Sequence, residues 1–141
     1  MTMDYALMFV IMVLIHIFVM PFVMVADPAD VYFSRTQVYM GVFMGAAMVA
    51  VDGAFHGNLL WIGIAIVTAA LSAIAYRRQW TIDDKQYLRD MIPHHSMAIL
   101  TSRSRLQSSD PRIARLAEQI LVSQTREIAE MRHMLKTTSV A

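Results

Sequence analysis

The sequence contains no cysteine among its 141 residues. Neither a disulfide bond nor a thiolate metal site is available, so any metal has to be held by other side chains. Lysine and arginine are also almost absent from the first half, because residues 1–76 contain only Arg35 against four aspartates, a formal charge of −3. Residues 77–141 have a formal charge of +4. Since charged groups are costly in lipid, this break near residue 77 separates a lipid-compatible half from a water-compatible half.

Three apolar stretches in the first half predict three transmembrane helices, over about residues 5–25, 38–55 and 59–76. The first stretch contains no charged residue, and it is long enough to cross a hydrocarbon core of roughly 30 Å. A tight turn at residues 56–58 separates the other two, which we expect to form a hairpin. Pro21 should kink the first span, as membrane helices tolerate. A cleaved signal peptide is not expected, since the first stretch lacks a basic region before it and a small-residue cleavage site after it.

The basic residues that flank these spans predict an orientation. The N-terminus and the second loop contain no lysine or arginine, whereas the first loop and the segment after the third span carry five. These are Arg35, Arg77, Arg78, Lys85 and Arg89. By the positive-inside rule, we expect an integral protein of a bacterial inner membrane with its C-terminal half in the cytoplasm.

Residues 81–141 predict a separate domain, a helical hairpin that follows a transmembrane domain of residues 1–80. Its first helix is expected over about 83–106, capped by Thr81 or Asp83, and its second from Asp110-Pro111 to about residue 136. The short connection at 107–109 makes the two helices antiparallel neighbours, so the whole chain is predicted to be all-α. One hairpin is half of a four-helix bundle. We therefore expect a homodimer or a higher homo-oligomer in which these apolar faces pair.

Histidine, methionine and glutamate side chains converge on the seam of this predicted hairpin. Folding about residues 107–110 brings Met91 and His95 level with Gln124 to Glu127, and Met131 lies about one turn further. Imidazole and thioether together suit copper, especially Cu(I), whereas zinc sites rarely use methionine. The candidate ligands are His94, His95, Met91, Met97, Met131, Met134, Glu127 and His133. The alternative is that these residues are ordinary core side chains of a helical interaction or assembly module without a metal.

The segment DKQYLRDMIPHHSMAIL and the later segment LAEQILVSQTREIAEMRHML resemble the domain of unknown function 305 family over about residues 83–136. The resemblance implies a ferritin-like helical bundle, and it implies copper binding, since members of that family include copper-binding proteins implicated in copper tolerance. The family motif falls here on Met91, His94, His95, Gln124, Glu127 and Met131. Many members have methionine or cysteine at the positions of Thr101 and Ser102, so one ligand is missing, and Met97 and His133 are its candidate substitutes. Many soluble members are exported, which opposes the cytoplasmic placement.

Methionines recur at every fourth position in the first two predicted spans. The first span carries Met8, Met12, His16, Met20 and Met24, and the second carries Met40, Met44, Met48, Asp52 and His56. The third span is equally apolar and contains no methionine. Because ionisable groups inside a membrane are costly, this ladder is a candidate track for Cu(I) through the bilayer. Its alternative is adaptable packing between close helices, with Gly41 and Gly45 at the contact.

An enzyme is not expected. Di-iron bundles use glutamates from several helices together with Glu-x-x-His motifs, and only Glu127 lies on the predicted seam. The arginines of the hairpin alternate with acidic residues along both helices, so no nucleic acid is expected as a partner. The sequence instead predicts a membrane-anchored copper-binding protein of metal homeostasis or tolerance. Its expected partners are membrane lipid, further copies of itself, and a protein that donates or accepts copper.

Overall fold

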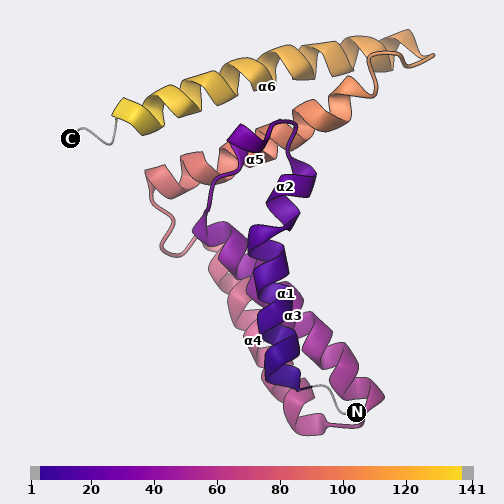
Figure 1. Ribbon diagram of the computed structural model, residues 1–141, viewed down its shortest axis with the longest axis vertical. Helices are drawn as coiled ribbons and strands as arrows, with labels where there is room; N and C mark the ends of the chain where they lie inside the picture. The colour runs from indigo at the N-terminus through magenta and orange to yellow at the C-terminus, as the bar shows by residue number, and fades with distance from the viewer. Residues whose placement is uncertain (1–3, 138–141) are drawn as a thin grey trace. The chain divides into compact units, whose positions relative to one another are not determined.

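A computed structural model describes residues 4–137 of the chain, and all regular structure in that range is helical. The helices are α1 (Tyr5–Phe18), α2 (Met20–Met24), α3 (Arg35–Phe55), α4 (Leu59–Arg77), α5 (Asp84–Arg103) and α6 (Pro111–Thr137), with a 3-10 turn η1 (Pro28–Asp30) (Figure 1). The all-α prediction is confirmed. The chain forms two compact units, one made of the chain up to Met20 with Ser34–Ile82, the other of Pro21–Phe33 with the chain from Asp83 on.

The first unit is a bundle in which α3 packs against both α1 and α4. Most of the buried positions on α3 and α4 are occupied by small residues: Gly41, Gly45, Ala46, Gly53, Ala65, Ser72 and Ala75. A Cβ atom at Gly45 would lie only 3.0 Å from the ring of Phe9 on α1. The helices therefore approach closely through residues without bulk, a packing mode that is common in membrane helices.

Two helices of this unit are long and apolar enough to cross a membrane, α3 with a mean hydropathy of 1.6 and α4 with 2.1. Both helices have capped N-termini: Ser34 and Gln37 form a capping box at α3, and the Asn58 side chain accepts from the Trp61 amide at α4. Between them Gly57 has a φ of +66°, the left-handed conformation that glycine adopts without steric cost. The predicted helices 38–55 and 59–76 thus correspond to α3 and α4.

The predicted span over residues 5–25 is not one helix, so three spans are not observed. Helix α1 ends at Phe18, and the separate short helix α2 begins at Met20. Pro21 explains the break, because it has no amide hydrogen and its ring clashes with the carbonyl of residue 17 in a continuous helix. At 14 residues, α1 rises roughly 21 Å, less than the roughly 30 Å of a hydrocarbon core.

The second unit is built on the hairpin of α5 and α6, which pack against each other. Its core consists of Ile92, Ile99, Ile128 and Met131, each at most 8 % exposed. Helix α5 continues through Pro93 and is capped at its start by Asp83, whose carboxylate accepts from the Gln86 amide. The connection spans residues 104–110 and is longer than the predicted 107–109.

Residues Pro21–Phe33 belong to this second unit, although the sequence places them between two apolar helices. Ala26 and Tyr32 pack against the hairpin core, and η1 contacts α5. The unit is therefore a hairpin with a third segment against it, which carries most of α2 and the 3-10 turn η1, rather than the two helices alone.

Candidate metal site in the helical hairpin

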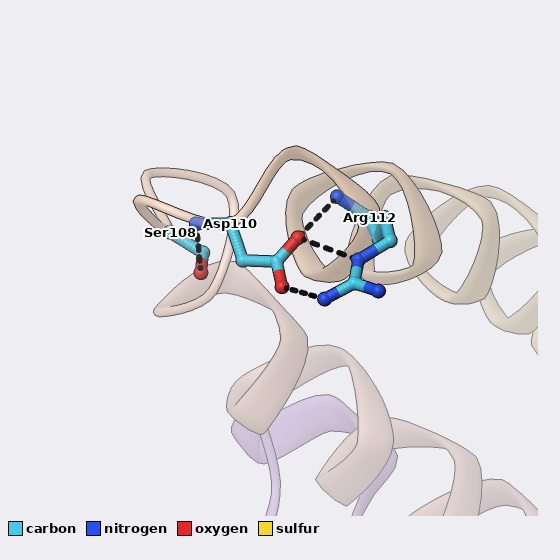
Figure 2. Close-up of polar contacts among 3 residues, drawn as sticks. All are labelled: Ser108, Asp110 and Arg112. Atoms are coloured by element: carbon cyan, nitrogen blue, oxygen red, sulfur yellow. Dashed lines mark hydrogen bonds and ion pairs between the residues drawn. The ribbon is translucent and has the colours of Figure 1, made fainter.

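The start of α6 fixes the hairpin at its closed end. Figure 2 shows Asp110 just before α6, where its Oδ1 accepts from the Arg112 amide at 2.9 Å and its Oδ2 from the Arg112 guanidinium at 2.7 Å. The Asp110 amide in turn donates to Ser108 Oγ at 3.3 Å. The guanidinium and the amide of Arg112 hold the pKa of Asp110 below its usual range. Since α5 and α6 run antiparallel from this end, the turn sets which residues face each other along the seam.

His95 and Glu127 face each other across that seam. Nδ1 of His95 lies 3.4 Å from Oε2 of Glu127, and the two side chains are 20 % and 37 % exposed. This pair is the one expected from folding the hairpin about residues 107–110. The contact lacks hydrogen-bond geometry, so Nδ1 of His95 is a buried polar atom without a hydrogen-bond partner among residues 4–137. A buried polar atom of that kind is uncommon and calls for an explanation.

The surroundings favour neutral imidazole at His95. Burial lowers its pKa, the Glu127 carboxylate opposes that shift, and neighbouring His94 adds to it. A histidine binds a metal through an unprotonated ring nitrogen, which the neutral imidazole has and the imidazolium lacks. A lowered pKa therefore keeps His95 in the form that can bind a metal at neutral pH.

Two of the candidate thioethers lie in the same core as this pair. Met131 on α6 is 8 % exposed and belongs to the buried cluster, and Met91 on α5 packs against that cluster half-buried. Both residues share the hairpin seam with His95 and Glu127. Imidazole, carboxylate and thioether groups are thus collected on one seam from two helices.

The other candidates lie further out. The His94 side chain is exposed, with its ring centroid 6.3 Å from that of His95, and Met97 is half-buried. His133 and Met134 are exposed on α6. Within the described part of the chain, no three His, Asp or Glu side chains form a group that could hold a metal ion. A site here consequently depends on thioethers in addition to His95 and Glu127.

A buried polar network next to these residues was missed by sequence reasoning. Asp30, 4 % exposed, accepts from Ser96 Oγ at 2.7 Å and from the Arg132 guanidinium at 2.6 Å. Ser96 Oγ also accepts from the Ala26 amide at 2.9 Å. Ser96 follows His95 and Arg132 follows Met131 in the chain, so Asp30 joins both helices beside the candidate ligands. The sequence shows only that Asp30 lies in a loop, and nothing near it in the chain indicates that it pairs with Ser96 and Arg132.

The methionine ladder is distributed between inner and outer surfaces. Met8 is buried and His16 lies against Gly41, where an added Cβ would be 3.4 Å from His16 Cβ. Met12, Met40 and Asp52 are half-buried. Exposed members are Met20, Met24, Met44, Met48 and His56. On α3, Gly41 lies next to His16 of the α1 ladder and Gly45 lies next to Phe9, which is outside the ladder. Met8 packs in a buried cluster with Val49 of α3 and Ala65 of α4.

Comparisons with known proteins give one family and one curated relative. The family model described as "Domain of unknown function (DUF305)" matches residues 68–139, slightly more than half of the chain. "Uncharacterized protein L153" of Acanthamoeba polyphaga mimivirus is 49% identical over 73 residues, which are 51% of this chain and 48% of that protein. The chain thus spans about half the length of this relative. No solved structure matches the chain.

Proposed function

The chain belongs to the domain of unknown function 305 family, and we propose that it is a membrane-anchored copper-binding protein of metal homeostasis or tolerance. In this proposal, Cu(I) is held by the hairpin of α5 and α6. His95 supplies imidazole, Met91 and Met131 supply thioethers, and Glu127 is a ligand or orients His95. The remaining Cu(I) ligands come from outer candidates that reach the ion after local rearrangement: His94, Met97, His133 and Met134.

The observation that carries the proposal is the buried Nδ1 atom of His95, which has no hydrogen-bond partner in residues 4–137. A metal ion explains such an atom, since imidazole nitrogen is the commonest protein ligand for transition metals. The nearby thioethers select the metal, because soft sulfur ligands favour Cu(I) over zinc or magnesium. The group therefore fits the residues present, and copper would supply binding and exchange of the ion rather than catalysis.

The membrane anchor is supported by the exposure of large apolar side chains on the first unit. Only 28 % of the apolar window of α3 and 17 % of that of α4 is buried within the chain. Exposed residues include Phe55 at 85 %, Leu59 at 81 % and Leu60 at 70 %. An apolar surface this extensive favours lipid over water. We place α3 and α4 across the bilayer with α1 beside them, and the hairpin in the cytoplasm, where the basic flanks direct it.

A Cu(I) competition titration on the full-length chain in mild detergent, under anaerobic conditions, tests the metal site. We expect His95→Gln to weaken binding by more than the 10- to 100-fold typical of losing an outer partner, and Glu127→Gln to fall within roughly that range. Gln119→Ala is the control, because it removes an exposed polar side chain of the same hairpin that is not among the candidate ligands. Unchanged affinity after joint replacement of Met91, His94 and His95 would refute the site.

The alternative is a helical interaction or assembly module without a metal. It is favoured by one observation, that no three His, Asp or Glu side chains in the described range are grouped for a metal. Both functions predict a homo-oligomer, since one hairpin closes half of a four-helix bundle. Sedimentation of the metal-free protein in mild detergent tests that prediction, and a strictly monomeric protein would contradict it. Oligomer formation that persists after the ligand replacements, with no measurable Cu(I) affinity in the parent chain, would favour the assembly module.

A further inference from the structure

The second unit contains an open cleft of about 620 Å³ at the end of the hairpin opposite the 104–110 turn. It lies between the start of α5, the end of α6 and the segment that carries η1. Four of its lining residues are basic: Lys85, Arg89, Arg132 and Lys136. Tyr32 and Leu135 add apolar surface to the lining. All of these residues belong to one compact unit, so the cleft is a feature of that unit alone.

The positive charge in the cleft is only partly compensated from within. Arg132 is paired with Asp30 at 2.6 Å. Lys85, Arg89 and Lys136 make no ion pair with any carboxylate in residues 4–137. About three positive charges therefore line one cavity without an internal counter-ion.

The spacing of these residues makes the cluster unfavourable without a ligand. Lys85 and Arg89 are four residues apart on α5, and Arg132 and Lys136 are four residues apart on α6. Like charges at this spacing lie on the same face of a helix and destabilise it. Because the helices are antiparallel, the two pairs meet at the same end of the hairpin. An anion bound among them would relieve the repulsion.

We propose that this cleft binds a phosphate-bearing anion of at least two negative charges. Arginine offers paired N–H donors that match phosphate oxygens, and lysine contributes mobile point charges. A cavity of this size also exceeds the needs of a single carboxylate. Two sources share the chemistry, a phospholipid headgroup and a soluble polyphosphate. The site requires no metal, so it is independent of the copper proposal.

The test uses the metal-free full-length chain in mild detergent, titrated in separate arms with tripolyphosphate, with short-chain phosphatidic acid and with short-chain phosphatidylcholine. Binding is followed by native mass spectrometry and calorimetry. Replacing Lys85, Arg89 and Lys136 by glutamine should weaken binding of the phosphate ligand at least about tenfold, since several charge-assisted contacts are lost. The matched control replaces the exposed Arg103, Arg105 and Arg115, which carry the same charge outside the cleft, and should change binding less than about twofold.

Each outcome decides the matter. Selective loss in the tripolyphosphate arm assigns a soluble ligand, and selective loss in the phosphatidic acid arm assigns a lipid headgroup. Equal weakening by both triple variants, equal binding of phosphatidylcholine, or no binding of any ligand overturns the proposal. The single variants Lys85→Gln and Lys136→Gln, which leave Asp30 and Arg132 paired, should give graded losses if a triple variant proves unstable. Raising the salt concentration should weaken binding in the parent chain, as expected of a charge-driven site.

Discussion

The two helical hairpins of this chain have opposite distributions of large and small side chains. On α3 and α4 the buried residues are mostly glycine, alanine and serine, and bulky residues such as Leu59 and Leu60 are exposed. Between α5 and α6 the buried residues are Ile92, Ile99, Ile128 and Met131, and most charged side chains are exposed. Both pairs are consecutive helices joined by a short connection.

This contrast identifies what drives each pair together. In water, a helix pair is stabilised by removing large apolar side chains from solvent, as in α5 and α6. In lipid that driving force vanishes, and close approach of backbones through small residues takes its place, as in α3 with its neighbours. Under the membrane placement proposed above, the two hairpins are suited to different solvents, and substitutions should affect them in opposite ways.

The largest expected effect is on the isoleucine core of the second unit. Ile92 has no exposed surface, so Ile92→Ala should lower the free energy of unfolding of this unit by about 2–5 kcal/mol. Leu60→Ala removes a similar side chain that is 70 % exposed, and should change stability by less than about 0.5 kcal/mol. Denaturant unfolding of the full chain in detergent, followed by circular dichroism, measures both. Equal losses of unfolding free energy in the two variants would show that the two hairpins are not stabilised differently.

Asp30→Asn should have the next largest effect, again in the second unit. The substitution removes the charge that pairs with Arg132 and sets an amide against Ser96 or Arg132. We expect a loss of about 1–3 kcal/mol. This is less than the 3–5 kcal/mol typical of fully buried pairs, because the Arg132 side chain is 37 % exposed.

Asp27→Asn is the control for the Asp30 substitution, since it removes the same charge from an exposed position in the same segment. Asparagine also keeps an oxygen for the Ala29 amide, which Asp27 caps. Thermal unfolding should separate the two variants by several degrees. Coincident transitions would mean that the segment contributes no stability to the hairpin.

Gly45→Val should selectively disturb the first unit. Its Cβ would lie 3.0 Å from the Phe9 ring and 3.2 Å from the Phe9 carbonyl oxygen, so α1 and α3 must move apart at a cost of about 1–3 kcal/mol. Gly63→Val is the matched control on α4, where nothing lies within 4 Å of an added Cβ. Disulfide cross-linking of cysteines introduced into α1 and α3 reports their separation. Unaltered cross-linking in Gly45→Val would show that the helices are not closely packed there.

Much of the helical framework was predictable because its signals are local. The Asp110-Pro111 start of α6, the Asp83 cap of α5 and the turn at Gly57 each depend on residues within one helical turn. The facing of His95 and Glu127 was also predictable, since a short connection fixes the register of an antiparallel hairpin.

The docking of the 21–33 segment was not predictable by the same reasoning. Asp30 is 66 residues from Ser96 and 102 from Arg132 in the chain. In sequence, it stands beside a proline in a polar loop and resembles any turn aspartate. The break between α1 and α2 was misjudged for a related reason. Pro21 was expected to kink a continuous span, but the chain that follows it packs with the other unit.

The smallest expected effect concerns the helix caps and pH. The Asp110 cap has a lowered pKa because Arg112 donates to its carboxylate, so the charged form is favoured in the folded state. The unfolded chain therefore takes up the proton first as pH falls, and the stability from this cap is present above about pH 3.8 and lost as pH falls through the lower folded pKa. The caps of α3 and α4 are Ser34 and Asn58, which do not titrate in this range. Acidification should thus loosen the start of α6 while leaving those of α3 and α4 intact, and amide hydrogen exchange at Arg112 and Trp61 measures the difference. Asp110→Asn should remove that part of the pH dependence, and a variant that retained it would show that another group is responsible.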